Sequence, residues 1–144
     1  MGATTATTAP AKPLPVIDTV SKGFWDLANR GRLSVQRCEA CGHAHYPGAP
    51  VCPRCLSKAQ SWQPVSGRGE LLSWVRFHRA YWEGFAAELP YVVILVRLEE
   101  GPLMVSNLIG AAAEEVPIGA PMEVVFERAT EAINLPKFRP LARG

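Results

Sequence analysis

Hydrophobic positions in the second half of the chain recur with the spacing of β-strands. After residue 66, five segments have the composition and alternation of strands: 70–78, 91–98, 102–109, 122–127 and the shorter 132–135. Gly101-Pro102 predicts a tight hairpin between the second and third segments, and residues 111–121 predict a helical turn between the third and fourth. This order predicts the five-stranded barrel of the OB-fold, which we place with a C-terminal tail in residues 66–144.

The first half of the chain begins with a different pattern. Residues 1–13 are rich in Ala, Thr and Pro and predict a disordered tail. A short amphipathic helix of about three turns follows, in which Gly31 suits the C-terminal end. The residue that caps its N-terminus is expected to be Asp18, Thr19 or Ser21. Its apolar positions are Phe24, Trp25, Leu27 and Ala28. The extended segments 33–38, 44–47 and 60–65 complete a predicted unit of helix and metal ribbon in residues 14–65. The fold class is therefore mainly β with one N-terminal α-helix.

All four cysteines of the chain lie in the stretch RCEACGHAHYPGAPVCPRC, as two Cys-x-x-Cys pairs. Two such pairs predict a tetrahedral zinc site with the ligands Cys38, Cys41, Cys52 and Cys55. Iron in a rubredoxin-like site is the alternative metal. Four cysteines leave no open position for water, so we expect one structural ion. A ribbon of this size cannot fold on its own core, whereas a structural zinc site contributes on the order of 10 kcal/mol.

The remaining polar residues give no pattern typical of an enzyme that acts alone. We find no nucleophile paired with a base and no Gly-rich phosphate loop, so we predict no catalytic residue. His43 and His45 are expected to be loop residues, because the tetrahedron is already filled. His78 has the parity of Trp74 and Arg76 in the first barrel segment and is expected to lie on the barrel.

Charge and hydropathy narrow the classes of partner. The formal net charge of +2 lacks the strong positive bias of a protein that follows phosphate backbones, which counts against nucleic acid. The longest apolar run, YVVILV at 91–96, is far shorter than the roughly 20 residues that cross a bilayer, and the N-terminal residues lack a signal-peptide pattern. We expect a cytoplasmic protein without a membrane partner.

The order of these features resembles a known family. It comprises FWDLANRGRL, the cysteine stretch, WQPVSGRGELLSW, SNLIG, IGAPMEVVFE and the terminal LPKFRP. Residues 16–140 together resemble the family once labelled domain of unknown function thirty-five, in which an N-terminal helix and a rubredoxin-like zinc ribbon precede an OB-fold. The resemblance implies an acyl-CoA-associated accessory subunit that partners thiolase-superfamily enzymes, including acyltransferases and aldolases of steroid side-chain breakdown.

An acyl-CoA role needs cations for the phosphates and an apolar path for the pantetheine and acyl chain. The candidates for CoA or partner contact are Arg37, Arg54, Lys137 and Arg139 for charge and Phe24, Trp25 and Phe138 for apolar contact. LPKFRP is expected to be a docking tail. The aromatic-rich YWEGFAAELPY, at 81–91, is expected to offer an apolar surface to a partner or acyl chain. The alternative function is single-stranded nucleic-acid binding, in which the same aromatic residues would stack on bases.

Overall fold

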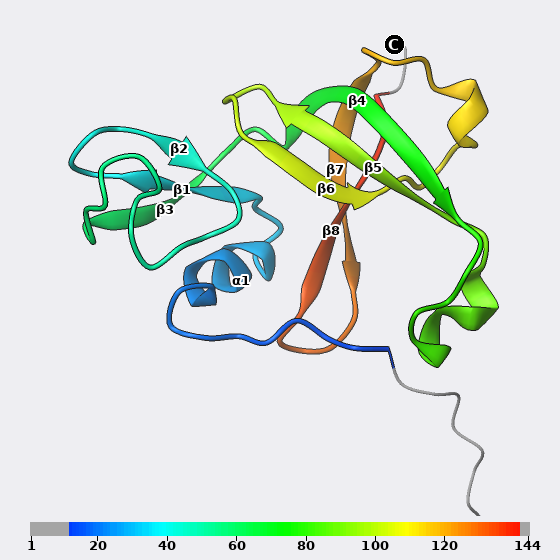
Figure 1. Ribbon diagram of the computed structural model, residues 1–144, viewed down its shortest axis with the longest axis horizontal. Coiled ribbons are helices and arrows are strands. Elements are labelled where there is room, and N and C mark those ends of the chain that lie inside the picture. The colour runs from blue at the N-terminus through cyan, green and yellow to red at the C-terminus, as the bar shows by residue number, and fades with distance from the viewer. Residues whose placement is uncertain (1–11, 142–144) are drawn as a thin grey trace, which may run out of the picture.

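The computed structural model describes residues 12–141. These residues form two antiparallel sheets, which a single segment of the chain connects, and one helix that contacts both sheets (Figure 1). The three-stranded sheet belongs to the cysteine ribbon, and the five-stranded sheet forms the barrel. Most of the predicted disordered tail, residues 1–11, lies outside the described residues, whereas Lys12 and Pro13 belong to an exposed extended segment. The mainly β class with an N-terminal helix is confirmed.

Helix α1 spans Lys22–Ala28, which is shorter than the predicted three turns. A turn precedes it, in which the Ser21 amide donates to Asp18 Oδ1 over 2.8 Å. Gly31, with φ of 75°, follows its end and allows the Arg32 amide to donate back to the Leu27 carbonyl over 2.9 Å. No helix within residues 12–141 has the length and apolar character needed to span a bilayer.

The ribbon sheet is built from β1 (Ser34–Cys38), β2 (Ala44–His45) and β3 (Gln60–Pro64) in the order β2-β1-β3. Strand β1 is central and pairs antiparallel with both neighbours. Val35, on β1, is buried beside the helix. The small sheet therefore presents one side to α1 and carries Cys38 at the end of its middle strand.

The barrel has the strand order β6-β5-β4-β7-β8, with all neighbours antiparallel. Its strands are β4 (Arg68–Phe77), β5 (Tyr91–Leu98), β6 (Leu103–Asn107), β7 (Pro121–Arg128) and β8 (Asn134–Pro140). A parallel bridge between Leu108 and Phe138 brings the two edges together, and Ser106 Oγ donates to the Pro136 carbonyl over 2.8 Å. The core inside is built from apolar side chains, with Val96, Met104 and Phe138 at 0% exposure.

Two short 3-10 helices lie in the barrel connections. The first, η1, spans Glu83–Glu88 between β4 and β5, inside the predicted aromatic segment. The second, η2, spans Ala113–Glu115 between β6 and β7, where the sequence predicts a helical turn. In Figure 1 both helices lie at the end of the barrel that is farther from the ribbon.

The structure corrects two predictions about strands. Strand β8 extends to Pro140, so the segment LPKFRP is part of the barrel and the prediction of a docking tail is wrong. Its backbone pairs with β7 along its whole length, from Asn134 opposite Arg128 to Pro140 opposite Met122. His78 follows the end of β4 and is exposed, instead of lying within the strand.

Helix α1 and the turn before it contact both the ribbon and the barrel. Trp62 of β3 donates from Nε1 to the Val20 carbonyl over 2.8 Å, and the Phe24 ring lies 5.6 Å from the rings of both Tyr46 and Trp62. On the other side, the buried Asn134 of β8 donates from Nδ2 to the Ala28 carbonyl over 2.8 Å. These contacts fix the position of the ribbon relative to the barrel.

Replacement of Gly23 by alanine tests the packing of α1 on the ribbon. Alanine is ordinarily the better helix former by about 1 kcal/mol, but a Cβ at Gly23 would clash with Trp62 Cδ1, whose ring is held by its hydrogen bond to Val20. We predict that Gly23→Ala lowers the free energy of unfolding of the metal-loaded protein by about 1–3 kcal/mol in urea titrations. Asp26→Ala, on the exposed side of the helix, should change it by less than about 0.5 kcal/mol. A stabilised Gly23→Ala protein would contradict this packing.

Candidate metal centre and binding surfaces

The four cysteines converge at one end of the ribbon. Their Sγ atoms all lie within 4.8 Å of one another, with 3.5 Å between Cys38 and Cys55 and 3.6 Å between Cys41 and Cys52. Four thiolates at about 2.3 Å from a tetrahedral zinc ion would stand about 3.8 Å apart. The four sulfur atoms therefore fit a single metal ion of this kind, and the residues predicted as ligands are the ones that meet.

Backbone turns shape each half of this centre. In the first pair the Cys41 amide donates to Cys38 Sγ over 3.4 Å, and in the second the Arg54 amide donates to Cys52 Sγ over 3.3 Å. Gly42 follows the first pair with φ of 78°, as its position predicts, and Leu56 follows the second with φ of 66°. The left-handed conformation at Leu56 has no glycine to signal it in the sequence.

The thiol groups oppose one another electrostatically in the absence of a cation. The backbone amide of Cys41 is the largest cause that lowers the pKa of Cys38, to about 6. The amide of Ser57 lowers the pKa of Cys55, but the hydrogen bond with Cys38 and burial outweigh this effect and raise that pKa to about 12. A thiolate at Cys38 therefore disfavours a second thiolate at Cys55, and a bound divalent cation would supply the charge that allows all four sulfurs to ionise.

The histidines between the pairs are occupied elsewhere. His45 is largely buried, with Nε2 2.6 Å from Gln60 Oε1 and Nδ1 3.1 Å from the Pro47 carbonyl oxygen. His43 stacks on His45 with ring centroids 5.7 Å apart. Neither belongs to the cluster of possible metal ligands found in residues 12–141, so the four cysteines form the whole set. The arrangement is that of a structural centre without a vacant ligand position.

Two of the predicted cations meet at a groove between the ribbon and the barrel. Arg37 and Arg54 both line a cavity of about 670 Å³, together with Tyr46 and with Leu103 from the barrel. Arg37 is anchored there, since its Nε donates to Gln63 Oε1 over 3.1 Å and its NH1 to the Gly42 carbonyl over 2.9 Å. Arg54 is exposed. Glu100 also lines this groove, and its Oε2 accepts a hydrogen bond from the Ser66 amide.

The other two predicted cations lie on a different surface. Lys137 and Arg139 are on β8, where they pair with carboxylates of β7: Lys137 Nζ lies 3.1 Å from Glu127 Oε1, and Arg139 Nε lies 2.9 Å from Glu123 Oε1. Neither lines the ribbon groove: Arg139 belongs to an ion pair of the barrel exterior, whereas Lys137 lines a larger cavity on the barrel.

The three predicted apolar contacts are buried inside the protein. Phe24 and Trp25 are 3% and 8% exposed and pack against each other edge to face, and Phe138 is fully buried in the barrel. Their side chains belong to the core, so the expectation that they offer an apolar surface to CoA or a partner is corrected. An apolar residue in the sequence can belong either to the core or to a binding surface, and its type alone does not distinguish the two.

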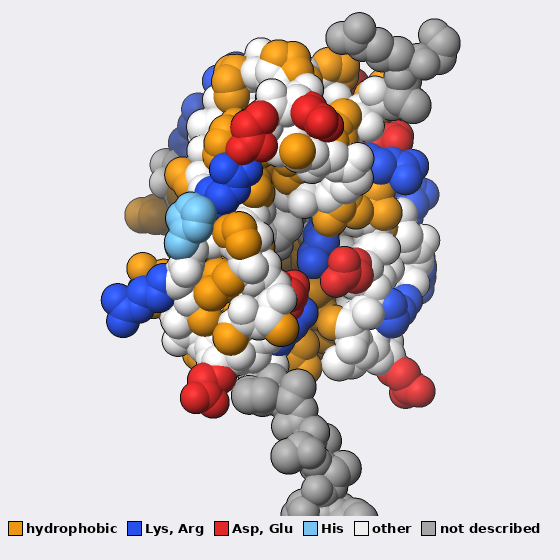
Figure 2. Space-filling model, turned by 90° about the vertical axis from the view of Figure 1, so that its right-hand side faces the viewer, with side chains coloured by type: hydrophobic (Ala, Val, Ile, Leu, Met, Phe, Trp, Pro, Cys, Tyr) orange, Lys and Arg blue, Asp and Glu red, His pale blue; other side chains and the backbone are white. Residues whose placement is uncertain are grey.

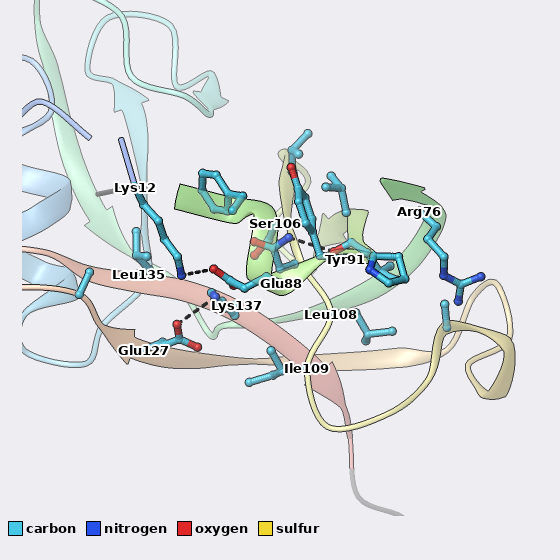
Figure 3. Close-up of a pocket in the computed structure, with 18 of the residues that line it drawn as sticks. Lys12, Arg76, Glu88, Tyr91, Ser106, Leu108, Ile109, Glu127, Leu135 and Lys137 are labelled. Atoms are coloured by element: carbon cyan, nitrogen blue, oxygen red, sulfur yellow. Dashed lines mark hydrogen bonds and ion pairs between the residues drawn. The ribbon is translucent and has the colours of Figure 1, made fainter. Parts of the chain in front are cut away.

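A larger cavity, of about 1170 Å³, lies on the barrel (Figure 3). It brings together the extended segment at residues 12–15, η1, the edge of β6 and the strand β8. Apolar side chains including Leu108, Ile109 and Leu135 line it, and the ion pair of Lys12 with Glu88 lies beside it. No pattern in the sequence predicts this cavity as a whole, and only the aromatic segment at 81–91 marks part of its lining.

Comparisons with known proteins agree with this architecture. Residues 25–59 match the family described as "ChsH2, rubredoxin-like zinc ribbon domain", and residues 62–127 match "ChsH2, C-terminal OB-fold domain". A "DUF35 domain-containing scaffold protein" of Pyrococcus furiosus is 32% identical over 131 residues, which are 87% of this chain and 95% of that protein. The chain belongs to the DUF35 family. The OB-fold and the zinc-ribbon predictions are thereby confirmed.

Two further relatives have names that describe larger assemblies. A solved structure described as "Ltp2-ChsH2(DUF35) aldolase" contains a chain with 35% identity and a TM-score of 0.77, covering 88% of this chain and 98% of its own length. A "Probable enoyl-CoA hydratase alpha subunit" of Thermomonospora curvata is 36% identical over 90% of this chain. The DUF35 chain spans 40% of the length of that hydratase subunit.

Loss of one ligand tests the metal centre. We predict that Cys52→Ser abolishes stoichiometric metal binding and lowers the free energy of unfolding by more than about 3 kcal/mol, because the ribbon depends on the ion for stability. Metal content by plasma mass spectrometry and urea unfolding measure the two effects. His43→Ala, which alters a neighbour that is not a ligand, should keep the metal. Full metal content in Cys52→Ser would show that the four-cysteine assignment is wrong.

Proposed function

We propose that this DUF35 protein is a non-catalytic accessory subunit that docks a thiolase-superfamily enzyme and helps to form its acyl-CoA binding channel. The enzyme would be an acyltransferase, a thiolase or a steroid side-chain aldolase. Support comes from the relatives, whose names describe a scaffold, a hydratase subunit and an aldolase assembly. The bond-making chemistry is assigned to the partner enzyme, since a metal with four cysteine ligands offers no position to a substrate.

The observation that carries the CoA part of this proposal is the meeting of Arg37 and Arg54 at the ribbon groove. Guanidinium groups bind phosphates through paired charge-assisted hydrogen bonds. In this groove they face the barrel hairpin, where Pro102 and Leu103 supply apolar surface suited to a pantetheine arm. Arg54 forms no ion pair with another residue in the part of the chain that the structure describes, so its charge is free for a ligand.

We assign zinc to the cysteine centre. Both zinc and iron accept four thiolates in a tetrahedron, and the match to a zinc ribbon favours zinc. Protein purified from medium without added metal should contain about one zinc ion per chain. A red protein that contains one iron ion in place of zinc would contradict this assignment.

Reversal of the charge at Arg54 tests the CoA groove. With the enzyme partner bound, we predict that Arg54→Glu raises the KM for the acyl-CoA substrate by about ten-fold or more, the value of one lost charge-assisted hydrogen bond. The matched control is Arg139→Gln, which removes a cation from the β7–β8 surface, where it already pairs with Glu123. The control should leave the KM within about two-fold of the wild type.

The same experiment separates the two parts of the proposal. If the wild-type chain forms a stable complex with a thiolase-superfamily enzyme, and Arg54→Glu has the KM of the wild type, the CoA groove is wrong and the accessory role stands. If the purified chain turns over an acyl-CoA by itself as fast as the complex does, the accessory role is wrong.

A further inference from the structure

One exterior face of the barrel is apolar where an exposed sheet should be polar. Strand β5 turns Ile94, Val96 and Leu98 into the core, where each is at most 1% exposed, and it turns Val93 and Leu95 outward. A strand with one face in water normally alternates between apolar and polar residues. Strand β5 instead has the composition of a strand that is covered on both sides.

Neighbouring strands continue this surface, which we call the apolar face: Val75 of β4, Val93 and Leu95 of β5, and Leu103 and Val105 of β6. The strand registers place Val75 opposite Val93 and Leu95 opposite Val105, so these side chains are direct cross-strand neighbours. Val75 is 53% exposed and Val105 is 64% exposed. The face is therefore contiguous, with Val93 and Leu95 partly exposed at its centre and Val75, Leu103 and Val105 exposed around them.

Aromatic residues extend the apolar face at the end of β4 and β5. The Phe77 ring lies 5.2 Å from that of Tyr91 and 6.2 Å from that of Tyr81, and Trp82 beside them is 59% exposed. Figure 2, which shows this end of the barrel, displays hydrophobic side chains gathered at the lower left of the view. Exposed Trp and Tyr side chains are the residues that most often anchor protein interfaces.

The opposite exterior of the same barrel provides a comparison. Its strands β7 and β8 carry the partly exposed ion pair of Arg139 with Glu123, the pattern expected of a sheet in contact with water, and the pair of Lys137 with Glu127 at the wall of the larger cavity. The apolar face has no charged residue between Arg97, which pairs with Glu70 at one end, and the loop at the other. The OB-fold alone does not account for this difference, because both surfaces belong to one barrel.

The loop end of the apolar face has an unpaired positive charge. Arg79 lies over the Tyr81 ring, 5.4 Å from its centroid, and within residues 12–141 it has no carboxylate partner. A guanidinium that is positioned by an aromatic ring and lacks a carboxylate is complementary to an acidic group on another molecule.

We propose that the apolar face, with Tyr81, Trp82 and Arg79 at its end, is the surface that docks the enzyme partner. The partner would present an apolar area of its own with a carboxylate opposite Arg79. Val93 and Val105 also line the larger cavity on the barrel, but Val75 and Leu95 lie outside it, and the exposed Trp82 with Arg79 at the end of the face favours a protein over an acyl chain. This inference rests on the proposed accessory function and adds to it the surface by which the complex forms.

The test uses the thiolase-like enzyme that co-purifies with the wild-type chain. We expect Val105→Glu to weaken the association by at least about ten-fold in calorimetric titration, because it places a charge in the apolar centre of the interface. Ile118→Glu is the matched control, since Ile118 is 62% exposed but lies in the connection between η2 and β7. The control should bind within about two-fold of the wild type.

A second pair of variants avoids any effect of a charge on the strand. Trp82→Ala, in the loop, should also weaken the complex by at least about ten-fold, and Arg79→Glu should slow association and remove most of its salt dependence. Melting temperatures close to that of the wild type show that each variant is folded.

Distinct results identify distinct failures. If the wild type binds the enzyme and both Val105→Glu and Trp82→Ala bind equally well, the docking surface is wrong while the accessory function stands. If the wild type alone sediments as a dimer, and Val105→Glu separates the dimer without changing the affinity for the enzyme, the apolar face joins two copies of this chain. If the wild type forms no complex with the enzyme, the inference and the proposed function both fail.

Discussion

The position of helix α1 between two sheets is the constraint on which the rest of the structure depends. The helix is only seven residues long, too short to be stable by itself, so its stability comes from the surfaces that it contacts. Phe24 packs between the aromatic rings of the ribbon, and the Ala28 carbonyl accepts a buried hydrogen bond from Asn134 of the barrel. A buried carbonyl without that bond would cost about 1–3 kcal/mol, which favours this one arrangement of the two sheets.

The metal centre and the helix stabilise the ribbon in complementary ways. Four cysteine ligands hold together the loops at one end of the ribbon, and α1 covers the apolar side of its sheet. The binding surfaces depend on both, because Arg37 and Arg54 belong to the metal-bearing ribbon while Leu103 belongs to the barrel. The groove between them exists only while the ribbon keeps its place, so a structural metal would support the proposed CoA binding without touching the ligand.

Local sequence patterns predicted the metal ligands and most strands of this protein. Contacts between residues far apart in the sequence decide which side chains are buried, paired or exposed. The cysteine spacing was sufficient for the metal centre, and the apolar run at 91–96 for strand β5. The last strand is predicted over 132–135, whereas β8 runs from Asn134 to Pro140, because an edge strand tolerates the prolines of LPKFRP. The pairing of Lys137 with Glu127 depends on the register of β7 with β8, which no local pattern specifies.

The function proposed for this DUF35 protein requires its two sheets to act as one body that carries a CoA groove and an adjoining docking face, which share Leu103. Amide nitrogen relaxation in the metal-loaded protein tests this requirement most directly, since it reports the tumbling of each sheet separately. We predict one rotational correlation time for the amides of β1 and β3 and for those of β5 and β8. Two distinct correlation times, with the ribbon tumbling faster than the barrel, would contradict the account.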